Sequence, residues 1–191
     1  MTKAGLRQMA VMPDANALAD AARAASKGGL PPVDKWNPPF CGDLDMQIRR
    51  DGTWFYEGTP IGRHKLVRLF STILKREGDD YFLVTPVEKV GITVEDAPFI
   101  AVDFTEDDGT LTFQTNVGDR VSADSEHPIR VERDDTGEPS PYVMVRNGLE
   151  ARIDRKSFYR LVDIGEVEGD WFGVRSDGTF FPIAPAADLP D

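Results

Sequence analysis

The chain has 191 residues, which is enough for one large domain or two small ones with a sizeable core. It is 40% hydrophobic with no apolar run near the roughly 20 residues that cross a bilayer, and its net charge of −11 disfavours polyanionic nucleic acids as partners. The single cysteine excludes an intramolecular disulfide, and with no signal sequence at the N-terminus we expect a cytoplasmic protein without a membrane partner.

The N-terminal region is predicted to contain a helix and an extended connector. Residues 14–27 are rich in alanine, a strong helix former, and Gly28–Gly29 follow as a stop signal. Residues 28–40 contain several prolines and glycines, which favour an extended chain. We therefore expect residues 1–29 to form an N-terminal arm.

Residues 30–98 are predicted to form a small α+β domain. Two strand-like runs within residues 44–56 flank Asp51–Gly52, which is a strong signal for a hairpin turn. A helix should follow, from Thr59 or Gly62 to about Glu77, because apolar residues recur there at helical spacing. A strand over residues 81–84 comes next.

Residues 99–185 are predicted to form a second domain that is mostly β. Short strand-like runs alternate there with acidic and glycine-rich turns, and Asn147–Gly148 marks another hairpin. Asp154 should cap a helix that runs from Arg155 to about Ile164. About four to six strands before this helix favour a bent sheet or a partly open barrel, followed by a loose tail over residues 186–191.

The two predicted domains share a sequence pattern. The stretch IGRHKLVRLF (61–70) is similar to IDRKSFYRLV (153–162), and EGDDYFLV (77–84) is similar to EGDWFGV (168–174). The Asp51–Gly52 and Asn147–Gly148 turns precede these stretches in the same order. We therefore predict an α+β protein with two related halves, each with an antiparallel sheet and one helix. The alternative is that two unrelated segments share the same periodicities.

The motifs of common enzyme classes are absent from the sequence. It contains no HExxH, GxSxG, P-loop or GxGxxG pattern, and its two histidines lack metal-ligand spacing. Acidic pairs are usually solvated surface groups, and Glu95–Asp96, which lies between apolar residues, is the best candidate for a metal or acid–base role. We expect no cofactor and no catalytic residue.

Both repeated helices begin with cations, which is unusual because a helix N-terminus favours negative charge. Arg63 and Lys65 begin the first helix, and Arg155 begins the second. The compensating charge could come from the protein's own carboxylates, since residues 92–139 alone carry a net charge of −10, or from an anionic ligand. If only one start binds an anion, we expect it to be the first, where Gly62 replaces the capping carboxylate. Arg68 and its counterpart Arg160 should instead form structural bridges, to a strand or between the halves.

Several stretches resemble a bacterial family designated domain of unknown function 1285. They are WNP (36–38), DLDMQIRRDGTWFYEGTPI (43–61), LVTPVEKVGITVEDAPF (83–99) and YVMVRNGLEARI (142–153). The resemblance implies an internally duplicated α+β protein whose C-terminal half is similar to pleckstrin-homology-like barrels. It also implies a role in signalling, with a nucleotide-like ligand between the halves, and no established activity.

The leading hypothesis is a non-enzymatic ligand-binding or sensor protein that binds a phosphate-bearing or nucleotide-like molecule between its halves. The candidate ligand-binding residues are polar positions within the motifs and the helix starts, namely Arg63, Lys65, Glu88, Lys89, Glu95, Asp96 and Arg155. A protein–protein adaptor that uses exposed sheet edges is the alternative. A metal-dependent hydrolase based on Glu95 and Asp96 is a weaker one.

Overall fold

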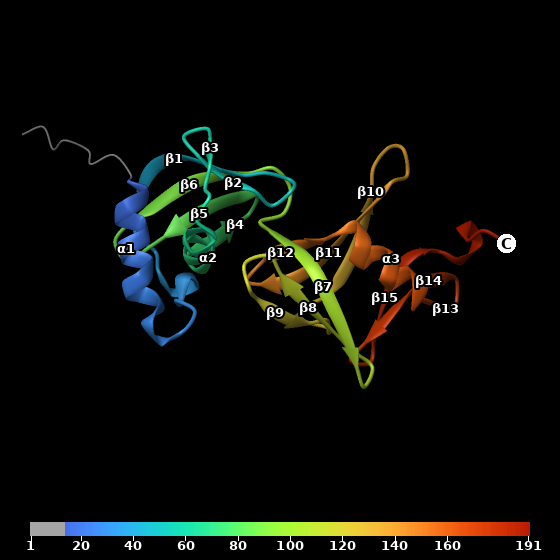
Figure 1. The fold of residues 1–191 in the computed structure, drawn as a ribbon. Helices are drawn as coiled ribbons and strands as arrows, with labels where there is room; N and C mark the ends of the chain where they lie inside the picture. Colours follow the sequence, from blue (N-terminus) through green and yellow to red (C-terminus); the bar gives the residue numbers. More distant parts are fainter. Residues whose placement is uncertain (1–13) are drawn as a thin grey trace, which may run out of the picture.

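The computed structural model describes residues 14–191 and shows two halves side by side, joined by the segment between β6 (Lys89–Val94) and β7 (Phe99–Asp107) (Figure 1). Each half has its own sheet and helix, so the α+β architecture with two halves is confirmed. Residues 1–13 of the predicted arm lie outside the described residues. No helix within residues 14–191 is long and apolar enough to cross a membrane.

The first half contains two α-helices and a mixed sheet. Its elements are α1 (Ala15–Ala25), β1 (Phe40–Ile48), β2 (Trp54–Tyr56), β3 (Thr59–Pro60), α2 (His64–Thr72), β4 (Leu74–Glu77), β5 (Asp80–Val84) and β6, with single 3-10 turns at Ser26–Gly28 and Val33–Lys35. The strand order is β3-β2-β1-β6-β5-β4. The expectation of a wholly antiparallel sheet was wrong, because β6 pairs parallel with β1.

The alanine-rich helix α1 is docked on the body. The Asp14 side chain accepts a hydrogen bond from the Asn16 backbone at 3.1 Å and caps its first turn. Leu18 and Ala22 are fully buried, and α1 packs against α2. The small side chains of α1 therefore allow a close approach to α2 and add a layer to the core of the first half.

Helix α2 is shorter than predicted. It ends at Thr72, and Leu74–Glu77, expected to continue the helix, form β4 and pair antiparallel with β5. The local pattern suits either structure, since Ile73 and Leu74 are fully buried in the strand arrangement as well. The backbone pairing with β5 therefore decides the conformation, which local periodicity cannot reveal.

The second half consists of a curled half-barrel, a helix and a small extra sheet. Its elements are β7, β8 (Thr110–Thr115), β9 (Arg120–Ser122), β10 (Ile129–Arg133), β11 (Pro139–Arg146), β12 (Leu149–Ile153), α3 (Arg155–Asp163), β13 (Glu166–Glu168), β14 (Trp171–Ser176) and β15 (Thr179–Pro185). The half-barrel has the order β10-β11-β12-β7-β8-β9 and confirms the predicted bent sheet. It too is mixed rather than antiparallel, because β12 pairs parallel with β7. The expected tail holds a 3-10 turn at Ala186–Asp188.

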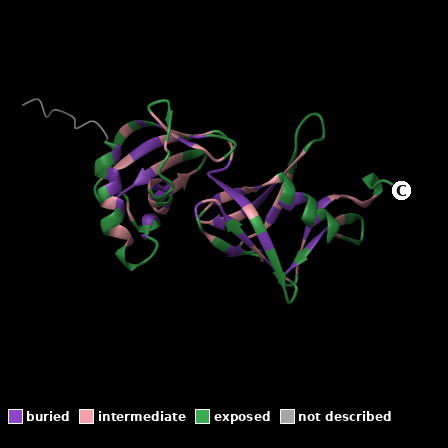
Figure 2. Ribbon diagram, viewed as in Figure 1, coloured by how far each residue is buried: buried purple, intermediate pink, exposed green. Residues whose placement is uncertain are grey.

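Buried residues gather between the sheet and helices of the first half and inside the curled sheet of the second (Figure 2). In the first half, Trp54 is 1% exposed and stacks on Phe70 with ring centroids 6.4 Å apart. In the second, Phe104 and Phe113 pack together at 5.5 Å. Each half thus has an aromatic centre of its own.

The duplication appears as the same succession of elements in both halves. A hairpin, a helix and a three-stranded meander follow one another as β1-β2, α2 and β4-β5-β6, and again as β11-β12, α3 and β13-β14-β15. The two hairpin turns place Gly52 at φ 87° and Gly148 at φ 77°, a left-handed conformation that favours glycine. The halves differ in that the first meander joins the hairpin's sheet, whereas the second forms a sheet of its own.

Candidate functional site

Asp96 lies at the centre of the junction between the halves. Its Oδ1 accepts a hydrogen bond from the Tyr142 hydroxyl at 2.7 Å. Its Oδ2 lies 3.5 Å from Arg50 Nη1 of the first half and 3.6 Å from Arg152 Nε of the second. Burial and the hydrogen bond to the Asp96 carboxylate raise the pKa of Tyr142 to about 12, so the hydroxyl remains a donor at neutral pH.

The hairpin turn of the first half is held at this place by Glu95. One carboxylate oxygen of Glu95 accepts from the Arg50 backbone at 2.8 Å, and the other accepts from Gln47 Nε2 at 3.0 Å. The Arg50 carbonyl then accepts from Arg152 Nη2 at 2.9 Å, and Arg50 Nη2 donates to Ser140 Oγ at 3.2 Å. Glu95 and Asp96 thus both serve to position arginines.

Three further arginines close the other side of the junction by donating to backbone carbonyls. Arg146 Nη2 donates to the Ser71 carbonyl at 2.9 Å, Arg76 Nη1 to that of Gly148 at 3.0 Å, and Arg68 Nε to that of Val117 at 3.1 Å. Arg50 and Arg146 occupy matching positions before the two hairpin turns, and each reaches into the opposite half. Each of the two duplicated turns therefore carries an arginine that bridges to the other half.

We predicted that the matched helix arginines would form bridges, either to a strand or between the halves. The structure contains one bridge of each kind. Arg68 of α2 bridges the two halves through Val117. Arg160 of α3 instead bonds within its own half, to the Asp103 carboxylate and the Phe104 carbonyl of β7.

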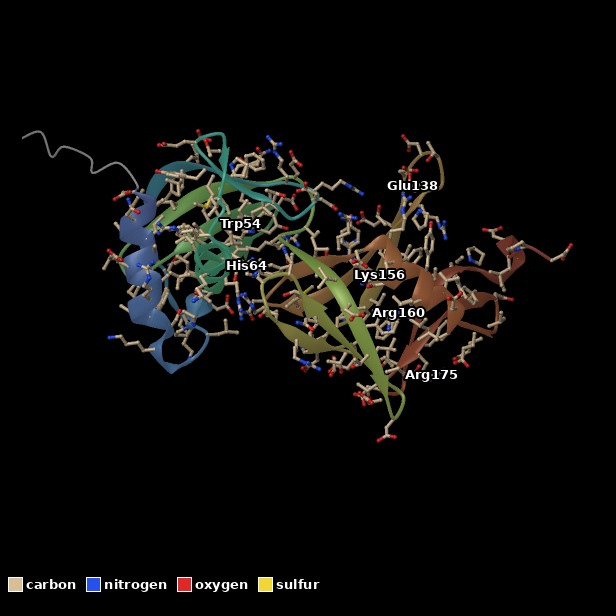
Figure 3. The ribbon with its side chains drawn as sticks, viewed as in Figure 1. Trp54, His64, Glu138, Lys156, Arg160 and Arg175 are labelled. Carbon is tan, nitrogen blue, oxygen red and sulfur yellow. The ribbon has the colours of Figure 1, made fainter. Side chains whose placement is uncertain are left out.

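A cavity of about 360 Å³, which we call the junction cavity, opens beside Arg50 and Arg152. Residues from both halves line it, namely Arg50, Glu138, Pro139, Ser140, Pro141, Arg152, Ile153, Arg155, Phe158 and Tyr159. The lining carries three arginines against one glutamate, although the whole chain has a net charge of −11. Figure 3 shows Glu138 near the β10–β11 loop and Lys156 on α3.

The cations of this cavity differ in how firmly they are held. The side chain of Arg152 is 23% exposed and donates to the Arg50 carbonyl. The side chain of Arg155 is 77% exposed, and its nearest carboxylate is that of Glu138 at 3.7 Å. Phe158 and Tyr159 provide an aromatic wall, and Tyr159 is 59% exposed. Such a cavity combines fixed and adjustable cations with an apolar surface, which suits an anionic organic molecule.

The structure brings some of the predicted ligand residues together and separates others. Arg155 lines the junction cavity, and Glu95 and Asp96 lie behind its arginines. Lys65 lines a different cavity between α2 and the β8–β9 turn. Lys89 lies on the outer face of the first sheet, where it pairs with Glu77 at 3.0 Å.

Arg63 and Glu88 lie outside the junction cavity. Arg63 is the exposed N-cap residue of α2 and makes no side-chain capping bond, and the Glu88 backbone donates to Thr85 Oγ1 in the turn before β6. At the second helix start, the Asp154 carboxylate accepts from the Ser157 backbone at 2.8 Å. The junction cavity therefore adjoins the second helix start, and anion binding at the first helix start stays a prediction.

Sequence reasoning missed Arg50, Arg152 and Tyr159. Arg50 belongs to the repeated pattern, but a position before a hairpin turn gives no sign that its side chain reaches into the other half. Within residues 14–191, no three His, Cys, Asp or Glu side chains are grouped so that they could hold a metal ion. The carboxylates of Glu95 and Asp96, the proposed hydrolase pair, face arginine and glutamine donors instead.

Comparisons with known proteins give consistent results. Residues 31–97 match the N-terminal domain, and residues 98–183 the C-terminal domain, of a family of unknown function, DUF1285. A crystal structure of a DUF1285 family protein from Silicibacter pomeroyi DSS-3 is 60% identical, with a TM-score of 0.84 over 90% of this chain and 96% of that one. Another from Shewanella baltica OS155 is 33% identical, with a TM-score of 0.52 over 63% and 91%. Curated proteins gave no match. Since the two family models match most of its length, the chain belongs to the DUF1285 family.

Proposed function

We propose that the protein is a ligand-binding or sensor protein that holds a phosphate-bearing or nucleotide-like molecule in the junction cavity. The observation that carries this proposal is the convergence of Arg50, Arg152 and Arg155, from both halves, on one cavity of an acidic protein. Arginine is well suited to phosphate because its planar guanidinium donates two parallel hydrogen bonds.

The rest of the lining matches the other parts of such a molecule. The volume of about 360 Å³ falls within the range of small-molecule sites, roughly 300–1,000 Å³. The exposed ring of Tyr159 offers a surface for stacking, and the Ser140 hydroxyl offers a hydrogen-bonding group at the edge. Because the two halves share the cavity, a bound molecule would contact both, and a ligand that binds one arrangement of the halves more tightly shifts the protein toward that arrangement.

Replacing Arg155 by alanine should weaken the binding of a phosphate-bearing ligand about 10- to 100-fold, because one charge-assisted hydrogen bond is worth about 1.5–3 kcal/mol. Stability should change by less than about 0.5 kcal/mol, since the side chain is 77% exposed. The measurement is a thermal-shift screen of nucleotides and sugar phosphates at millimolar concentration, followed by calorimetric titration of any hit.

The matched control is Lys156→Ala, which removes a cation from the next position of α3, outside the cavity. This variant should bind as the wild-type protein does. Equal losses in both variants would point to general charge attraction rather than a site. A melting temperature that stays constant across the whole panel would contradict the proposed function itself.

A further inference from the structure

Asp96 is shared by arginines from the two halves and belongs to the segment that connects them. Its side chain is 17% exposed, and its Oδ2 faces both Arg50 and Arg152. It does not line the junction cavity, so it lies behind these arginines when they are viewed from the cavity. A carboxylate in this position acts on a ligand through the arginines, without touching it.

The pairing between Asp96 and the arginines is electrostatic but lacks full hydrogen bonding. The Oδ2 atom and Arg152 Nε are both buried, and neither has a hydrogen-bond partner among residues 14–191. The separations of 3.5 and 3.6 Å exceed the 2.7–2.9 Å typical of a charge-assisted hydrogen bond. Buried polar atoms are almost always bonded, so this arrangement leaves the Arg152 Nε–H group as a donor for a competing anion.

We infer that Asp96 is an internal counter-ion that sets the affinity and the charge selectivity of the junction cavity, which makes it a specificity-determining residue. This inference rests on the proposed function. Three arginines face the carboxylates of Glu138 and Asp96, which leaves one surplus positive charge. A bound anion has to compete with Asp96 for Arg50 and Arg152, and the negative charge of Asp96 opposes a doubly charged phosphate more strongly than a monoanion.

The test is the substitution Asp96→Asn, which removes the charge but keeps an oxygen for the Tyr142 hydroxyl. The probes are pyrophosphate and, as a monoanion, acetate, titrated calorimetrically at constant ionic strength. Pyrophosphate should bind the variant about tenfold more tightly than the wild-type protein, because one nearby repulsive charge is gone. The gain for acetate should be smaller, and Asp96→Glu, which keeps the charge, should show no gain.

A role of Asp96 in positioning alone predicts the opposite result, because arginines released from Asp96 would become mobile and bind anions more weakly. Equal or weaker pyrophosphate binding by a folded Asp96→Asn variant would therefore overturn the inference and leave the proposed function intact. If no phosphate compound binds either protein, the proposed function fails and the inference with it.

A second measurement keeps the inference testable if Asp96→Asn does not fold. In the wild-type protein, pyrophosphate should shift the NMR signal of the buried Arg152 Nε–H group as well as that of the exposed Arg155, because the ligand alters the Asp96 pairing. A titration that moves the Arg155 signal and leaves Arg152 Nε–H unchanged would overturn the inference.

Discussion

Replacing Arg146 by alanine should destabilise the protein by about 3 kcal/mol, because breaking a buried ion pair leaves its partner uncompensated. The Arg146 side chain is 14% exposed and pairs at 3.4 Å with Asp119. The Asp119 side chain is itself only 16% exposed. It also donates to the Ser71 carbonyl at the end of α2, so the substitution removes a bridge between the halves. Urea denaturation should show a lower midpoint, and small-angle scattering should show a less compact molecule.

The control for this prediction is Arg175→Ala. Arg175 pairs with Glu166 and Glu168 at the surface of the small sheet, where its side chain is 41% exposed. Exposed ion pairs contribute about 0–1 kcal/mol, so this variant should unfold close to the wild-type midpoint. If Arg146→Ala and Arg175→Ala have the same small effect, the arginine bridges do not hold the halves together.

Replacing Trp54 by alanine should destabilise the protein by about 3–5 kcal/mol, the usual effect of removing a large buried aromatic side chain. Trp54 is 1% exposed and stacks on Phe70, so its loss opens a void between the sheet and α2. The indole Nε1 is buried and has no hydrogen-bond partner among the described residues, so the contribution comes from packing. Chemical denaturation followed by circular dichroism measures the change.

Trp171 provides the comparison, because it is the same residue type at 47% exposure in the second half. Trp171→Ala should lower the free energy of unfolding by less than about 1 kcal/mol. A Trp54→Ala protein that unfolds at the wild-type midpoint would mean that α2 packs without this stacked pair.

Local signals predicted the elements whose conformation depends on near neighbours in the sequence. The turns at Gly52 and Gly148 require the left-handed conformation, and the Asp154 cap satisfies a backbone donor three residues away. The α2 boundary was wrong because β4 forms only through pairing with β5. The parallel β1–β6 and β12–β7 pairs were missed for the same reason, since sheet partners far apart in the chain leave no local pattern.

The candidate site was likewise predictable from the sequence only in part. The sequence pointed to cations at the helix starts and to Glu95–Asp96, and of these Arg155, Glu95 and Asp96 lie at the junction. It could not show that Arg50 reaches Ser140, 90 positions away, or that Lys65 and Lys89 lie in other cavities. Distances between side chains on different elements depend on how the halves pack.

By itself, the sequence determined that this is a duplicated α+β protein with two sheet-and-helix halves, because periodicity, turn residues and caps are written in consecutive positions. Only the tertiary structure decided that both repeated hairpin turns lie at the junction, each with an arginine that reaches into the opposite half. The physical reason is that those contacts depend on how the two halves pack against each other. That packing also places one carboxylate, Asp96, between the arginines that line the cavity.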